Sequence, residues 1–222
     1  MEAKHPEFKE GEKKYYEVKI NQVINSLKKN GIEGKYFDMS EEAMDWIIKN
    51  LPDGGIVGVG GSRTLFQIGL IDKLIQQNNI TFINRWREGI TPKEQMKTRY
   101  ANFSANLFLT STNAITLDGK LINIDGMGNR VACMIFGPRK VFFIVGRNKI
   151  VKDVQAGIER VRNIAAPKNA QRYNLQLPCT ETGQCDEKNC YGPRICNFIL
   201  IIERGFKVGR MTVLLINEDL GF

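Results

Sequence analysis

Histidine is nearly absent from this sequence of 222 residues, which contains only His5, in a polar N-terminal segment. A serine or cysteine nucleophile activated by a histidine of the same chain is therefore excluded. A zinc site built from several histidines is excluded as well. Any general acid or base that the chain provides must be a carboxylate, a lysine, a tyrosine or a cysteine.

Long apolar runs are also missing, and no stretch approaches the ~18 consecutive apolar residues of a membrane-spanning helix. The first residues, Met1 to Pro6, lack the apolar segment of a secretory signal. We therefore expect a cytoplasmic protein. The chain is long enough to bury a hydrophobic core that needs no disulfide or structural metal for its stability.

Net positive charge is absent from the first fifty residues and present after them. Residues 1–50 hold 9 Lys and Arg against 10 Asp and Glu, whereas residues 51–222 hold 23 against 14. No block of consecutive basic residues and no aromatic-basic RNA motif accompanies this excess, so we expect no nucleic-acid partner. The bias favours a protein that binds an anionic small molecule.

The stretch from residue 56 to residue 64, IVGVGGSRT, predicts a buried strand that runs through a glycine-rich turn into a helix. Glycines let the backbone turn sharply and let a ligand approach it closely. Ser62 is a good N-cap residue, and the free N–H groups at a helix start suit a phosphate or a carboxylate. The stretch is neither a Walker A motif nor a complete GxGxxG, and a tight turn without a ligand is the alternative. The candidate ligand-binding residues are Gly58, Gly60, Gly61, Ser62, Arg63 and Thr64.

Strand and helix patterns alternate from residue 56 to residue 110, which predicts an α/β fold with a Rossmann-like, mostly parallel sheet flanked by helices. Ligands of such sheets bind at the carboxyl ends of the strands, so we expect the glycine turn and residues 111–113 to lie together. The expected strands are 56–59, 80–85, 107–110, 140–145, 198–202 and 211–216, with a hairpin at 114–124 and helices over 64–77, 91–105 and 148–167. The apolar run at 131–136 is short enough to be either a helix or a strand.

We predict a single domain over residues 15–222, preceded by a flexible tail of residues 1–14. Two helices, over 15–30 and from Ser40 to Leu51, form an N-terminal layer. The parts of the domain are the N-terminal helices (15–51), the glycine-turn core (54–175), a cysteine-rich loop (176–197) and the C-terminal strands (198–222).

Polar side chains gather in and after the predicted hairpin, and they are candidates for completing a pocket. Asp118 and Asp125 suit general acid and base roles if they are partly buried. The alternative for Asp118 is structural, because Asp-Gly is a common hairpin turn. Arg130 precedes an apolar run and needs a partner, either Asp125 or a bound anion. The further candidates of this group are Asn113, Thr116 and Asn129.

Four of the five cysteines fall within 18 residues of each other, in a polar segment. In a cytosolic protein such a cluster favours a metal over structural disulfides, and four thiolates suit zinc or an iron–sulfur cluster. The spacing matches neither the paired CxxC of zinc ribbons nor the ferredoxin motif, so reduced thiols or a redox disulfide remain the alternative. The candidate ligands are Cys179, Cys185, Cys190 and Cys196, whereas Cys133 lies in an apolar run and is expected in the core.

Several motifs occur in order along the chain: GVGGS (58–62), NAITLDG (113–119), DGMGNRV (125–131), FGP (136–138), GRNKIV (146–151) and RIC (194–196). Together they resemble the LUD (lactate-utilisation) domain family over about residues 10–222. The resemblance implies a fold similar to the ribose-phosphate isomerase, glucosamine-phosphate deaminase and CoA-transferase group. In those relatives the glycine turn and the Asp-Gly loops face a phosphorylated sugar or a CoA ester.

Family members act with iron–sulfur and oxidase subunits in bacterial L-lactate oxidation, which implies such partners. This chain lacks the ferredoxin-type cysteine runs of the iron–sulfur subunit, so it would not be that subunit.

Three functions are compatible with these observations. The first is binding of an anionic small molecule, phosphorylated, CoA-linked or a carboxylate, in or accessory to organic-acid oxidation. The second is an independent isomerase, transferase or hydrolase that acts on a phosphorylated or CoA-linked substrate with an aspartate base. The third is metal or redox sensing through the cysteine loop. The sequence leaves open whether the protein forms a homo-oligomer.

Overall fold

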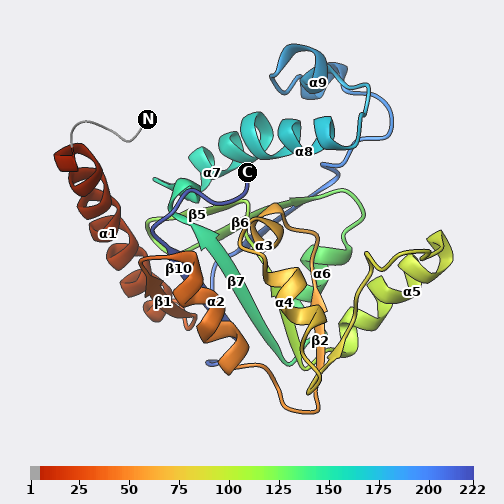
Figure 1. Cartoon of the computed structure of the whole chain (residues 1–222). Coiled ribbons are helices and arrows are strands. Elements are labelled where there is room, and N and C mark those ends of the chain that lie inside the picture. Colours follow the sequence, from red (N-terminus) through yellow and green to blue (C-terminus); the bar gives the residue numbers. More distant parts are fainter. Residues whose placement is uncertain (1–5) are drawn as a thin grey trace.

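The computed structural model describes residues 6–222, and the segment 1–5, with His5, lies outside the described residues. Two sheets organise the chain (Figure 1). The main sheet has six parallel strands in the order β1-β10-β7-β4-β2-β3, and the second has four strands in the order β8-β5-β6-β9. The strands are β1 (Glu33–Phe37), β2 (Ile56–Val59), β3 (Thr81–Phe82), β4 (Leu107–Thr110), β5 (Ala114–Thr116), β6 (Leu121–Asp125), β7 (Lys140–Gly146), β8 (Ile150–Val151), β9 (Phe198–Ile202) and β10 (Met211–Ile216). The predicted α/β class and parallel sheet are confirmed.

Helices cover both faces of the main sheet because alternate residues of its strands point to opposite sides. In β7, Phe143 packs with α1 and α6, whereas Ile144 packs with α2, α3 and α4. The helices are α1 (Pro6–Lys29), α2 (Ser40–Lys49), α3 (Arg63–Gln67), α4 (Leu70–Ile75), α5 (Pro92–Ala101), α6 (Asn129–Ile135), α7 (Val154–Arg160), α8 (Ala166–Arg172) and α9 (Pro178–Thr182). Short 3-10 or π turns are η1 (Asn102–Ser104), η2 (Arg147–Lys149), η3 (Val161–Ala165) and η4 (Glu187–Asn189). None of the helices within residues 6–222 combines the length and the apolar character needed to cross a membrane.

The second sheet is built on the predicted hairpin, in which β5 and β6 pair antiparallel. Gly119 forms its turn with a φ of +80°, and a Cβ there would lie 2.8 Å from the main-chain nitrogen of Leu27. The tip of the hairpin is therefore seated on α1, where a side chain would not fit. α7 and α8 lie across this sheet (Figure 1), with Val161 and Ala166 packed against Ile122.

The N-terminal region differs from the sequence-based prediction in two ways. α1 already begins at Pro6, whereas the apolar pattern placed its start near residue 15, because the first turns of this helix are exposed and carry no apolar face. β1 was not predicted at all. It is an edge strand of half-exposed residues that pairs with β10, near the other end of the chain, so local patterning could not indicate it.

Two helices expected as continuous segments are interrupted. The predicted helix 64–77 divides into α3 and α4 at Gly69, whose φ is +72°. The predicted helix start at Asn148 is wrong, because residues 147–149 form η2 and residues 150–151 pair with β5 as β8. α7 begins after Asp153, whose carboxylate accepts a hydrogen bond from the main-chain nitrogen of Ala156 at 2.9 Å. The ambiguous run at 131–136 belongs to α6.

A candidate site in a cationic cavity

A cavity of about 700 Å³ opens at the carboxyl ends of the parallel strands. Its walls come from the turn after β2, the segments after β4 and β6, η2 after β7, the helix α8 and the loop at residues 193–195. The glycine turn and residues 111–113 thus lie together, as the parallel topology predicted.

Eight of the candidate ligand-binding and catalytic residues line this cavity, and four do not. Those in its walls are Gly61, Ser62, Arg63, Thr64, Asn113, Asp125, Asn129 and Arg130. Gly58, Gly60, Thr116 and Asp118 lie elsewhere.

Gly58 and Gly60 make room for packing behind the cavity wall. A Cβ on Gly58 would lie 2.3 Å from Oδ1 of Asn102, and a Cβ on Gly60 would lie 2.8 Å from Oγ1 of Thr110. Asp118 is in the hairpin turn, where its side chain is 60% exposed and pairs with Lys120 at 3.5 Å. Asp118 therefore occupies the Asp-Gly turn of the hairpin, which is the structural alternative given for it above.

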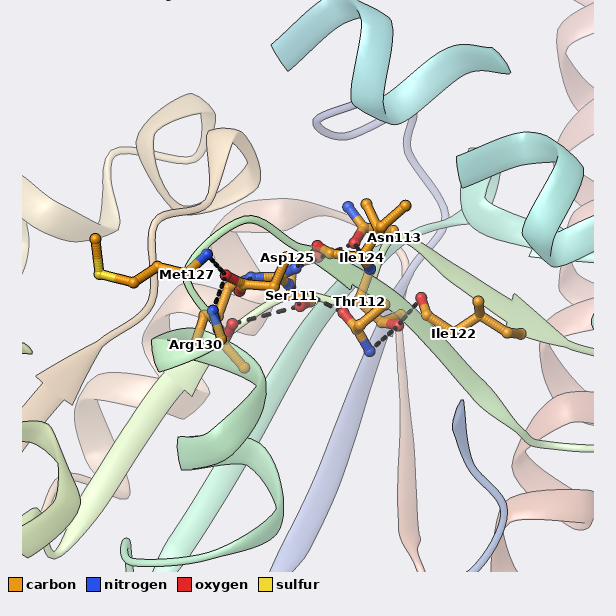
Figure 2. Close-up of polar contacts among 11 residues, drawn as sticks. Ser111, Thr112, Asn113, Ile122, Ile124, Asp125, Met127 and Arg130 are labelled. Atoms are coloured by element: carbon orange, nitrogen blue, oxygen red, sulfur yellow. Dashed lines mark hydrogen bonds and ion pairs between the residues drawn. The ribbon is translucent and has the colours of Figure 1, made fainter. Parts of the chain in front are cut away.

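Arg130 is a buried brace between the ends of β4 and β6 (Figure 2). Its Nε contacts Oδ2 of Asp125 at 3.3 Å. Its other N–H groups donate to Ser111 O (3.2 Å), Asn123 Oδ1 (3.0 Å), Asn113 Oδ1 (3.1 Å) and Ile124 O (2.6 Å). These contacts occupy all five N–H donors of a guanidinium. Burial lowers the pKa of Arg130, and the Asp125 carboxylate opposes that effect.

Asp125 is committed to the same network. Its Oδ1 accepts hydrogen bonds from the main-chain nitrogens of Met127, at 3.2 Å, and Gly128, at 2.9 Å, which shape the turn before α6 (Figure 2). Its Oδ2 faces Arg130. In this arrangement Asp125 is a structural acceptor, and its 9% exposure leaves little of it open to the cavity.

Lys149, which sequence analysis did not select, is a further cavity residue. It is 3% exposed, and its Nζ lies 2.8 Å from Oγ1 of Thr64 and 2.8 Å from Oγ of Ser111. Burial lowers the pKa of this amine well below its ordinary value, and the nearby Arg160 and Arg130 lower it further. The GRNKIV motif contains the signal, but the predicted helix over residues 148–167 concealed it.

Arg85, also missed, lies against the glycine turn. A Cβ on Gly61 would be 2.3 Å from its Nη2. The guanidinium stacks on Trp86, 4.5 Å from the ring centroid, and burial lowers its pKa. Within residues 6–222 it forms no ion pair, and its Nε has no hydrogen-bond partner.

Comparison with known proteins matches the LUD domain to residues 20–216. The chain belongs to the LUD domain family. A solved structure of a DUF162 family protein from Deinococcus radiodurans is similar with 12% sequence identity and a TM-score of 0.49, over 90% of this chain and 97% of that chain. No curated protein matches the sequence. The matched region of this LUD domain contains both sheets and every cavity residue except Phe222.

The cysteine segment of this LUD domain follows α8 and leads into the loop at 193–195 that closes the cavity. All five cysteines are free, and Cys133 is buried as expected. Burial raises the pKa of Cys179, and Cys190 and Cys185 raise it further. Among residues 6–222, no group of three or more His, Cys, Asp or Glu side chains is arranged to hold a metal ion. A metal at the four cysteines stays a prediction.

Proposed function

We propose that this LUD domain binds an anionic small molecule, phosphorylated, CoA-linked or a carboxylate, in the cavity beside the glycine turn. The observation that carries the proposal is Arg85. Among the described residues, no carboxylate lies within ion-pair distance of this partly buried guanidinium, although Asp125 acts on it from farther away. Burial of such a charge is costly, and a bound anion would supply a close counter-charge and hydrogen-bond acceptors.

The charge of the whole cavity supports the same ligand class. Asp125 is its one carboxylate side chain among the described residues, and it is paired with Arg130. The remaining arginines of the wall form no ion pair within residues 6–222: Arg63, Arg85, Arg99, Arg172 and Arg194. A concave site with one sign of charge concentrates ligands of the opposite sign.

Membership of the family supports a proposal for the physiological setting. We place the binding step in organic-acid oxidation, with iron–sulfur or oxidase subunits as partners, because the LUD domain is named for lactate utilisation. A cavity of this volume suits a phosphorylated metabolite or part of a CoA ester more closely than an extended polymer.

Thermal unfolding with inorganic phosphate, coenzyme A and L-lactate tests the proposal. A ligand that binds only the folded state raises the melting temperature with its concentration. We expect at least one of these probes to do so in the natural protein, and Arg85→Met to weaken that binding by about tenfold or more, as for loss of a charge-assisted hydrogen bond. Arg204→Met is the matched control, because Arg204 is exposed and does not line the cavity.

A second variant, Gly61→Leu, displaces the Arg85 guanidinium from the glycine turn, because even a Cβ at residue 61 would lie 2.3 Å from Nη2 of Arg85. We expect it to keep the far-UV circular dichroism of the natural protein and to lose the ligand-induced stabilisation. The proposal fails if none of the three probes shifts the melting temperature, or if both cavity variants respond like Arg204→Met.

A further inference from the structure

Lys149 stands out among the cavity residues because two hydroxyls contact its amine, whereas its charged neighbours in the described part of the chain are arginines. Thr64 comes from α3, Ser111 follows β4, and both place a side-chain oxygen 2.8 Å from Nζ. None of the ion pairs within residues 6–222 includes Lys149. Buried lysines that serve as structural cations are normally paired with an acid.

We infer that Lys149 is a nucleophilic amine that forms an imine with an aldehyde or ketone carried by the anionic ligand. This inference rests on the proposed function, because the arginines of the cavity would hold the anionic group while the carbonyl meets Nζ. It names the substrate class as anionic carbonyl compounds, such as 2-oxo acids or phosphorylated aldehydes and ketones.

The chemistry needs only a neutral amine and groups that carry protons. The lone pair of Nζ attacks the carbonyl carbon, and the former carbonyl oxygen takes a proton to give a carbinolamine. Loss of that oxygen as water leaves a protonated C=N bond on Nζ, with one net proton drawn from solvent. The hydroxyls of Thr64 and Ser111 lie 2.8 Å from Nζ, so they are in place to transfer these protons.

The environment of the amine favours its nucleophilic form. Arg130 of α6 and Arg160 of α7 are the charged groups that act on it from the elements packed around it, and both disfavour a second positive charge. Arg160 is itself held in place, because its Nη1 donates to the main-chain oxygen of Asn113 at 2.6 Å. Its Nε donates to that of Asn148 at 3.1 Å.

A purely structural role predicts a different behaviour. If Lys149 serves only to tie η2 to α3 and β4, it should be protected from reagents like any core residue. An imine-forming lysine should instead react with a carbonyl probe selectively, at neutral pH, and more readily when the probe carries an anion.

Borohydride trapping separates the two roles. Pyridoxal 5′-phosphate and pyruvate are each incubated with the full chain near pH 7, reduced with sodium borohydride, and the modified lysines are identified by peptide mass spectrometry. We expect an adduct of about one equivalent per chain on Lys149, lost in Lys149→Met. Pyridoxal, which lacks the phosphate, should label Lys149 at least tenfold less, and Arg85→Met should lower labelling by pyridoxal 5′-phosphate by a similar factor.

Thermal unfolding with the same probes keeps this inference distinct from the proposed function. Stabilisation by pyruvate or pyridoxal 5′-phosphate without an adduct on Lys149 would overturn the inference and leave anion binding intact. Labelling spread over exposed lysines, with no preference for Lys149, would also overturn it. If Lys149→Met does not fold, the position of the adduct in the natural protein decides the question.

Discussion

Lys149 and Arg130 are both buried basic residues of one cavity wall, but their partners differ. Arg130 has Asp125 and an acceptor for every N–H group, so its charge is compensated within the chain. Lys149 has two hydroxyls and two cationic neighbours. A buried lysine without a counterion sheds its proton, whereas a guanidinium keeps it, so the two residues serve different purposes.

This difference predicts how stability depends on pH. The pKa of Lys149 is lowered in the folded protein, so between that value and the ordinary 10.5 the unfolded chain binds one more proton than the folded chain. The free energy of unfolding contributed by this residue therefore rises with pH across that window. In Lys149→Met the rise should be absent.

Urea denaturation of both proteins from about pH 6 to about pH 10 measures the effect. Burial raises the pKa of Cys133 to about 11, so its contribution to the free energy of unfolding falls as the pH rises. Both proteins contain Cys133, so this contribution cancels when their free energies are compared. Parallel stability curves for the two proteins would show that Lys149 titrates normally in the folded state.

At the scale of single elements, the sequence predicted those whose signals are local. The helix predicted from residue 91 is α5, which begins with a capping box in which the main-chain nitrogen of Glu94 lies 3.3 Å from Oγ1 of Thr91. The glycine turn, β4 and the hairpin were also found, because turn residues and apolar runs mark them directly. β1 and β8 were missed, because they have few residues and depend on pairing with distant strands.

The cysteine segment is where we predict a metal. It contains only the short elements α9 and η4, and its thiols influence one another's ionisation. Burial raises the pKa of Cys185 and of Cys196, whereas Arg162 lowers that of Cys185 and Arg194 lowers that of Cys196. Positive charges of these arginines would stabilise thiolates bound to a metal.

We therefore expect anaerobically purified protein to contain about one equivalent of zinc, or one iron–sulfur cluster, per chain. Elemental analysis, sulfide determination and a visible absorption spectrum distinguish the two. Cys185→Ser should lose the metal, whereas Cys133→Ala, which alters a buried thiol in the core, should retain it. Metal-free protein that melts like the metal-loaded protein would rule out a structural metal here.

For the whole molecule, the candidate site depends on segments that meet only in three dimensions. Sequence analysis placed Ser62 and Asn113 at one edge of the sheet because parallel topology is a general rule. It could not place Arg85, which follows β3 and reaches Gly61 because β3 pairs beside β2. Lys149 likewise reaches Thr64 through η2, which the helix pattern concealed. The missed residues are those whose position depends on long-range packing.

The net charge of the chain is +8, and several arginines that form no ion pair within residues 6–222 line the cavity, so the whole molecule should attract anions over a distance. We expect the association rate of a fluorescent coenzyme A analogue, measured by stopped flow, to fall several-fold from about 20 mM to about 200 mM potassium chloride, because salt shortens the range of the electrostatic field.

Arg63→Gln should reduce both the association rate and its salt dependence, because Arg63 is an exposed cation at the cavity wall. Arg139→Gln removes an exposed charge outside the cavity and should change the rate little. Equal effects of the two variants would mean that net charge alone, and not the cationic cavity, governs the encounter.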